Sequence, residues 1–439
     1  MAFQGDNTRS TENANANSPK GNGAKKSTLR ATLAGENGEG EVKVDEKVFR
    51  SLLAEHLLPM LAGTDLGKTK LSSPRHALVA YENPVSLLMK PARNAGYRLQ
   101  LKRSQAFSPE EKRLVELLVT ELGDIAAQSD ADHLSDFMSA APRRVISEFL
   151  PRRTGRGTLE QAIRDFEALA AQTYEGHPIV AALGITGSVG HGSISLEDLW
   201  REDFSRVISN GFDSMYLCGS DGRVFNVAYL SDPPSVEYAP HRLGSIAEWC
   251  SDQRVAIVLN RSGEVLVFKN RKLQFAKRRG AWRYYAHDSV VKRLGVGNKS
   301  LRRAVYESCL DVSFARSGGC IAVLSIGGKK KVAKVIKSRD LIDRIEQIRT
   351  KLLERVIKKR FHQLDRRLRQ ELLSMDGATV LTRTGEVLTA GCIVKVPSGS
   401  TGGGRKAAAM QLSKLGLAIK ISSDGPITGF KKRKAIFSL

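Results

Sequence analysis

The chain has 439 residues, of which 41% are hydrophobic and 26% are charged, a composition typical of soluble proteins with two or three globular domains. It contains no apolar run near the roughly 18 residues that a membrane span needs and no hydrophobic signal-peptide core, so we expect a cytoplasmic protein with no membrane partner. The net charge is +23, and residues 291–439 carry 32 Lys and Arg against 11 Asp and Glu, a net of +21, which indicates a polyanionic partner for the C-terminal third.

The N-terminal half predicts a tail followed by a helical region. Residues 1–45 are rich in Asn, Ser, Thr and Gly and poor in hydrophobic residues, which predicts a disordered tail. Residues 46–178 are expected to form a mainly helical region. Apolar spacing predicts a helix over 108–128 with Ser108 as its N-cap, and residues 95–103 alternate like a strand.

The next segment, residues 179–290, predicts an antiparallel, hairpin-rich α+β domain. Residues 213–230 read as two alternating strands around the turn Ser220-Asp221-Gly222, and residues 254–287 repeat that pattern with further turns. The five cysteines of the chain have neither disulfide-framework nor zinc-ligand spacing, so we expect reduced thiols.

Residues 291–439 predict an α/β domain with a mixed sheet and flanking helices. A helix over 300–315 precedes a buried strand at 320–326, and more strands follow residue 374. Between them we expect one long cationic helix over 340–373, whose inner stripe consists of Ile345, Ile348, Leu352, Val356 and Leu364.

Three stretches of this last segment carry a family resemblance: "AVYESCLDVSFARSGGCIAVL", "MDGATVLTRTGEVLTAGCIVKVP" and "GGGRKAAAMQLSKLGLAIKISSDGPITGF". In this order they resemble the diadenylate cyclase (DAC) domain, the nucleotide-binding domain of the DNA-integrity scanning protein and its relatives. The resemblance covers about residues 300–430. It implies a divergent member with a sensor-like N-terminal extension, and an adenine nucleotide as ligand.

The resemblance also implies site residues. The family's DGA motif stands here as Asp376-Gly377-Ala378, and in active cyclases its Asp holds Mg²⁺ or Mn²⁺. A turn Asp-Gly between a helix and a strand is the structural alternative for these residues. Independently of the family, the run "SGSTGGGR" (residues 398–405) has the chemistry of a polyphosphate cradle. It offers backbone N–H groups, a hydroxyl and, with Lys406, two cations just before a helix of small residues. The candidate nucleotide-binding residues are therefore Asp376, Gly377, Ala378, Ser400, Thr401, Gly402, Gly403, Gly404, Arg405 and Lys406.

The chain departs from the family at its RHR motif. The three positions hold Gly404, Arg405 and Lys406, so one basic residue is lost and the His is replaced. Lys does not reproduce the bidentate grip of Arg on a phosphate. This departure leaves phosphate binding in place and alters the pattern that orients a triphosphate.

Three functions follow as hypotheses. The first is a sensor or regulator that binds ATP, a cyclic dinucleotide or a related adenine nucleotide. The second is an active diadenylate cyclase that joins two ATP into cyclic di-AMP, with Asp376 as the catalytic metal ligand; the family's face-to-face active sites imply a homodimer or higher oligomer. The third is nucleic-acid binding through the basic helix Arg344–Arg369 and the cations Lys431–Lys434, for which a solvated helix face is the alternative.

Overall fold

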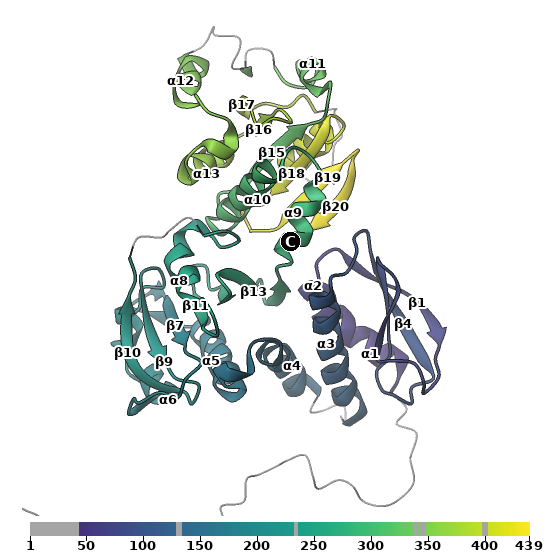
Figure 1. Cartoon of the computed structure of the whole chain (residues 1–439), viewed down its shortest axis with the longest axis vertical. Helices are drawn as coiled ribbons and strands as arrows, with labels where there is room; N and C mark the ends of the chain where they lie inside the picture. The colour runs from purple at the N-terminus through teal and green to yellow at the C-terminus, as the bar shows by residue number, and fades with distance from the viewer. Residues whose placement is uncertain (1–43, 129–133, 232–235, 338–339, 342–347, 397–402) are drawn as a thin grey trace, which may run out of the picture. The chain divides into compact units, whose positions relative to one another are not determined.

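The structure is a computed structural model that describes residues 44–128, 134–231, 236–337, 340–341, 348–396 and 403–439. The predicted disordered tail therefore lies almost wholly outside the described residues. Within them the chain has the predicted mixed α/β architecture, with a four-stranded, an eight-stranded and a six-stranded sheet and a short two-stranded one (Figure 1). No helix among these residues is long and apolar enough to cross a membrane.

The first sheet differs from the sequence prediction, which anticipated only its strand at 95–103. Its order is β1-β4-β3-β2, all antiparallel. Strand β1 is largely exposed and β3 is wholly buried, so neither shows the alternation that reveals a strand in sequence. The elements are α1 (Glu46–Leu52), the π-helical turn η1 (Leu53–Leu57), α2 (Leu58–Met60), β1 (Thr64–Leu71), β2 (Val79–Asn83), β3 (Ser86–Met89) and β4 (Tyr97–Arg103).

Three helices follow, α3 (Pro109–Gln128), α4 (Leu134–Phe149) and α5 (Arg156–Leu169), with the short η2 (Arg152–Thr154) between the last two. The predicted cap of α3 is confirmed, since the Ser108 hydroxyl accepts the Glu111 N–H at 3.2 Å. Helices α4 and α5 pack on the eight-stranded sheet, where Phe149 meets the rings of Phe275 and Tyr284 edge-on. Residues 46–178 and this sheet therefore share one hydrophobic core.

The eight-stranded sheet has the order β14-β13-β12-β11-β7-β9-β10-β8. Its predicted hairpins are confirmed: β9 pairs with β10, and β11 to β14 form an antiparallel meander. The pair β7 and β9 is parallel. The strands are β7 (Ala181–Ile185), β8 (Ile194–Ser195), β9 (Ser214–Cys218), β10 (Arg223–Tyr229), β11 (Val255–Leu259), β12 (Val265–Lys269), β13 (Lys272–Arg278) and β14 (Ala281–Tyr284).

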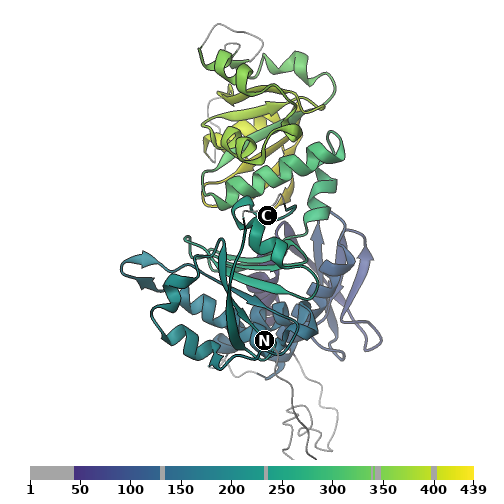
Figure 2. The ribbon, with the colours of Figure 1, turned by 60° about the vertical axis from the view of Figure 1, so that its left-hand side comes forward.

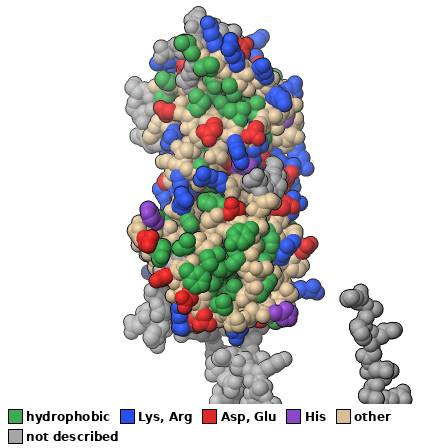
Figure 3. Space-filling view, turned by 90° about the vertical axis from the view of Figure 1, so that its left-hand side faces the viewer, with side chains coloured by type: hydrophobic (Ala, Val, Ile, Leu, Met, Phe, Trp, Pro, Cys, Tyr) green, Lys and Arg blue, Asp and Glu red, His purple; other side chains and the backbone are tan. Residues whose placement is uncertain are grey.

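Short elements complete this segment: β5 (Thr173–Tyr174), β6 (His177–Pro178), α6 (Leu196–Arg201), α7 (Ser205–Ile208), η3 (His241–Leu243), α8 (Gly244–Trp249) and α9 (His287–Leu294). Large hydrophobic side chains are exposed near the outer end of the sheet, among them Phe204, Val207, Phe225 and Tyr229. Figure 3 shows a hydrophobic patch on this face. All five cysteines are buried and unbridged.

The C-terminal sheet is mixed, as predicted, with the order β17-β16-β15-β18-β19-β20. Strands β15 and β16 run parallel, and the other neighbours are antiparallel. The strands are β15 (Gly319–Leu324), β16 (Ala378–Leu381), β17 (Val387–Cys392), β18 (Gly416–Ile421), β19 (Ile427–Lys431) and β20 (Lys434–Ser438).

Helices cover both faces of this sheet. Along β15, Ile321 and Val323 face the core beneath α10 (Lys299–Phe314) and α13 (Arg366–Ser374), whereas Cys320 and Ala322 face α11 (Gly328–Val332) and α14 (Gly404–Leu412). Because alternate residues serve two cores, β15 is buried along its whole length. The result is a helix–sheet–helix sandwich (Figures 1 and 2).

The predicted long helix over 340–373 is wrong. Among the described residues of this range, the α-helices are α12 (Ile348–Val356) and α13, and the residues between them include the 3₁₀ turn η5 (Phe361–Gln363). Ile348, Leu352 and Val356 are 78%, 57% and 52% exposed, Leu364 is buried as predicted, and Ile345 lies outside the described residues. The break occurs because Phe361 is drawn fully into the core and donates its N–H to the Gly385 carbonyl at 2.7 Å. Asp365 then caps a new helix.

A buried ion pair ties α13 to α10. The Arg366 guanidinium donates to both carboxylate oxygens of Asp311, at 2.7 and 2.8 Å. It also donates to the carbonyl oxygens of Val236 and Ala239, and Asp311 accepts the His241 N–H at 2.8 Å. This cluster joins the C-terminal helices to the segment that follows β10.

We predict that Arg366→Ala lowers the free energy of unfolding by about 3–5 kcal/mol, because it leaves the Asp311 carboxylate buried without a countercharge. Chemical denaturation measures the effect. Arg383→Ala is the control, since that side chain is exposed and forms no ion pair or side-chain hydrogen bond with the described residues, and it is expected to change stability by no more than about 0.5 kcal/mol. Equal losses in the two variants would contradict the prediction.

Candidate functional site

The predicted DGA residues form the joint between α13 and β16. Asp376 is exposed, and its Oδ1 accepts the N–H of Gly377 at 3.1 Å. Gly377 has φ +103°, and a Cβ on it would lie 2.5 Å from the carbonyl carbon of Gly391. Ala378 is the buried first residue of β16. Backbone packing against β17 therefore requires the glycine, while the carboxylate stays accessible.

The predicted cradle is described from Gly403 onward; Ser400, Thr401 and Gly402 lie outside the described residues. Gly403, at φ +80°, is the N-cap of α14 and supplies no side-chain cap. The first N–H groups of a helix have no intrahelical acceptor, and Gly404, Arg405 and Lys406 occupy this first turn. This helix end can therefore bind an anion.

Three cations gather beside that helix end. The Arg405 side chain lies against Gly318: a Cβ built on Gly318 would be 2.9 Å from Nη1 of Arg405. Lys406 is exposed. The pKa of Lys420, on β18, is lowered by burial and then by repulsion from Lys406 and Arg405. Within the described part of the chain none of the three forms an ion pair, so their charge is not neutralised.

Strand register brings the DGA joint to the same end of the sheet. Ile321 of β15 pairs with Thr379 of β16, which places Gly319 level with Gly377. Gly319 also pairs with Ile421, the last residue of β18. Neighbouring strands lie about 5 Å apart, so the start of β16, the start of β15 and the end of β18 lie side by side at one end of the sheet. We call this end of the strands the sheet edge. Asp376 and Arg405 thus reach one edge of the sheet from separate elements.

Sequence reasoning missed other residues of this edge. Gly318 and Lys420 are placed there by the register, and the hydroxyls of Ser317 and Ser374 lie 2.8 Å apart beside them. The Ser-Gly-Gly stretch before β15 is the signal that could have indicated the joint. No local signal marks Lys420, which sits in a strand of otherwise apolar residues.

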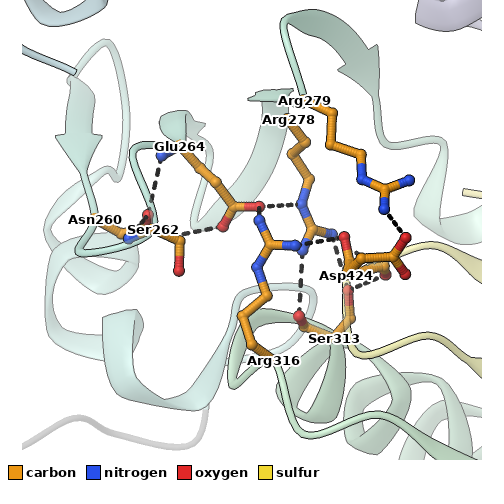
Figure 4. A network of polar contacts seen from close by, with 9 residues as sticks. Asn260, Ser262, Glu264, Arg278, Arg279, Ser313, Arg316 and Asp424 are labelled. Atoms are coloured by element: carbon orange, nitrogen blue, oxygen red, sulfur yellow. Dashed lines mark hydrogen bonds and ion pairs between the residues drawn. The ribbon is translucent and has the colours of Figure 1, made fainter. Parts of the chain in front are cut away.

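The edge continues into the turn Asp424-Gly425, which a polar network holds (Figure 4). Arg316 donates to the Asp424 carbonyl, and the Ser313 hydroxyl donates to the Gly425 carbonyl at 2.5 Å. The Asp424 carboxylate pairs with Arg279 of the eight-stranded sheet segment. The turn is therefore anchored from outside its own sheet.

Buried charges form the centre of this network. Glu264, only 1% exposed, accepts from the guanidinium groups of both Arg278 and Arg316. Arg278 also donates to the Ser313 hydroxyl at 2.8 Å and to its carbonyl at 3.2 Å. Burial alone would lower the pKa of Arg278, but the pKa is raised because Tyr285 and Glu264 favour the charged form. The network keeps all its charges paired while it links β12 and β13 to α10.

The predicted nucleic-acid surface is changed by the break in its helix. Two cations of the segment, Arg366 and Arg369, point inward and pair with Asp311 and Glu307. Lys432 and Arg433 form the exposed turn between β19 and β20. Fewer cations of the basic segment are therefore available to phosphates than the sequence suggests.

No family model matches the chain, and no curated protein matches it. Among solved structures, a hypothetical membrane spanning protein from Bacillus cereus is similar over 33% of this chain and 65% of its own, with 14% identity and a TM-score of 0.25. A double mutant of DacA from Staphylococcus aureus is similar over 34% of this chain and 87% of its own, with 16% identity and a TM-score of 0.20. At such TM-scores neither likeness bears on fold or function.

We predict opposite stability effects at two glycines of the site. Gly377→Ala should cost at least about 2 kcal/mol of unfolding free energy, because the backbone of β17 occupies the space of the new methyl group and φ is positive. The methyl group of Gly404→Ala would meet no atom of the described residues within 4 Å, and position 404 lies in a helix, so this change should be neutral or stabilise by up to about 1 kcal/mol. Thermal or urea unfolding distinguishes them, and a harmless Gly377→Ala would contradict the packing described.

Proposed function

We propose that the C-terminal sheet edge binds an adenine nucleotide and that the protein acts as a nucleotide-responsive regulator in the cytoplasm. One observation carries the proposal: Arg405, Lys406 and Lys420 lie together, without ion pairs among the described residues, beside the start of α14, whose N-cap residue is Gly403. Unpaired cations at a helix N-terminus are the chemistry that binds phosphate groups. The adenine specificity rests on the resemblance of residues 300–430 to the DAC domain.

The proposal assigns separate roles to the two sides of the edge. The N–H groups of the first turn of α14 and the Arg405 guanidinium would bind the phosphates. Asp376 would hold Mg²⁺ or Mn²⁺ together with phosphate oxygens and water. A lone carboxylate suits this role, because Mg²⁺ keeps several waters and takes few protein ligands, and no cluster of three or more metal-ligating side chains occurs among the described residues.

Diadenylate cyclase activity is the second candidate. The exposed carboxylate of Asp376 at the same edge favours it. It would bring two chains together face to face, since each would supply one ATP. The Gly at position 404 counts against it, because one phosphate-orienting cation of the family is lost.

We predict that Arg405→Ala weakens ATP binding at least tenfold, through loss of a charge-assisted hydrogen bond worth roughly 1.5–3 kcal/mol. Calorimetry with ATP and Mg²⁺ measures this. Lys414→Ala is the matched control, since it removes an exposed cation just beyond the other end of α14 and should leave affinity unchanged. Absence of ATP and cyclic di-AMP binding by the wild type would refute the proposal.

The same samples, incubated with ATP and Mg²⁺ or Mn²⁺ and analysed by mass spectrometry, separate the two candidates. Asp376→Asn is the informative variant, because it keeps the oxygen that accepts the Gly377 N–H and removes the charge. Cyclic di-AMP made by the wild type and lost in Asp376→Asn would establish the cyclase. Binding without product would leave the regulator.

We further predict that Gly404→Arg tightens ATP binding by about tenfold. A side chain at this position enters open space, and a guanidinium there would lie within the cationic group at the helix start. Gly404→Gln is the control of similar reach without charge. An equal gain for the two variants, or none for Gly404→Arg, would contradict this role for the position.

A further inference from the structure

A second site of interest is a cleft outside the sheet edge. It opens between the β11–β12 turn, the η3 segment and the ends of α10 and α13. Two adjoining hollows, of about 210 and 660 Å³, share six residues: Phe212, His241, Arg242, Arg261, Ala315 and Gln370. A hollow of this size falls in the range that binds small molecules.

Three guanidinium groups line the larger hollow, from Arg242, Arg261 and Arg367. All three residues are exposed, and none is ion-paired within the described part of the chain. The one carboxylate lining the larger hollow belongs to Glu371, since Asp311 in the smaller one is already held by Arg366. The cleft therefore has a surplus of unpaired positive charge.

Neighbouring groups contact the Arg242 side chain and fix the backbone around Arg261. The Arg242 guanidinium lies 5.9 Å from the centre of the Phe212 ring. Arg261 stands in a turn fixed by Asn260, whose side-chain oxygen accepts the N–H groups of Ser262 and Glu264 at 2.9 and 3.0 Å. The backbone that carries Arg261 is thus fixed, while the three guanidinium groups stay exposed to the cleft.

His241, a residue of the cleft wall, has one ring nitrogen without a hydrogen-bond partner among the described residues. Arg367 donates from Nε to Nε2 of His241 at 3.2 Å, so the proton of this imidazole resides on Nδ1. Nδ1 is buried and has no hydrogen-bond partner among the described residues. Burial and the charge of Arg366 lower the pKa of His241, which keeps the ring neutral.

We infer that this cleft binds a nucleoside phosphate, with its phosphates on Arg242, Arg261 and Arg367 and its base against Phe212 and Phe314. Guanidinium groups select phosphate oxygens, and the two half-buried phenyl rings of the walls offer the flat apolar surface that a base requires. Gln370 supplies an amide that can meet the edge of the base. The inference stands independently of the nucleotide site at the sheet edge.

The cleft is joined to the network of Figure 4. Arg316 lines the smaller hollow and donates to Glu264 at 2.7 Å and to the carbonyl of Asp424. Asn260, also in the wall, donates to Glu264 at 2.7 Å. A ligand in the cleft would therefore contact side chains that hold the turn at the sheet edge.

Photolabelling of the full-length protein with 8-azido-ATP, followed by peptide mapping, tests the inference. We expect label on peptides that contain Phe212, Phe314 or Gln370. Arg242→Gln combined with Arg261→Gln should reduce that label about tenfold or more, since two phosphate contacts are lost. The double variant should keep the wild-type unfolding midpoint, because both side chains are exposed and unpaired among the described residues.

Arg405→Ala is the matched control, and it should leave the label in the cleft unchanged. Label confined to peptides of residues 403–431 would overturn the cleft and leave the sheet-edge site standing. Label in the cleft alone would overturn the sheet-edge site instead. Cleft label that persists in the double arginine variant would also overturn the inference, since it would show that the arginines do not hold the ligand.

Discussion

The structure depends most on the buried carboxylate of Glu264, which two arginines from different elements share. A carboxylate that is 1% exposed is stable only when its charge is compensated, and Arg278 and Arg316 provide this from β13 and from the end of α10. The same guanidinium groups also contact Ser313, Gly425 and Asp424, and removing Glu264 would leave the Arg278 guanidinium buried without a countercharge. The eight-stranded and six-stranded sheets are consequently joined through directional polar contacts as well as hydrophobic ones.

This joint has consequences for the sheet edge. The turn at Asp424 follows β18, the strand that carries Lys420, and it is fixed by residues of the preceding segment. Gly318 lies between the two groups, since a Cβ on it would be 2.9 Å from both Arg405 and the Ser423 nitrogen. A small displacement of the turn would therefore change the space available to the Arg405 side chain. The turn and the Arg405 side chain are thus neighbours across a position that leaves room only for glycine.

Local pattern explains which parts of this fold could be predicted from sequence. The helix α10, the hairpin β9–β10 and the buried strand β15 follow from spacing and turn residues, and all three were predicted. The helix break at Phe361 could not be, because it depends on a tertiary pocket that takes up one phenyl ring. The candidate site also has a part that the sequence predicts and a part that it does not. Motif residues revealed Asp376 and Arg405, but their shared edge depends on the register of β15 with β16 and β18, which involves residues about 60 and 100 positions apart in sequence.

Gly377 and Gly404, the glycines of the two sequence motifs, have different structural explanations. Gly377 is required by backbone packing against Gly391, so its presence in a DGA sequence is explained by the fold alone and adds little evidence for a ligand. Gly404 is the reverse case, since no atom of the described residues lies within 4 Å of a Cβ built there. The described part of the fold therefore permits a larger side chain at position 404. Packing explains the glycine at 377, whereas it does not explain the one at 404.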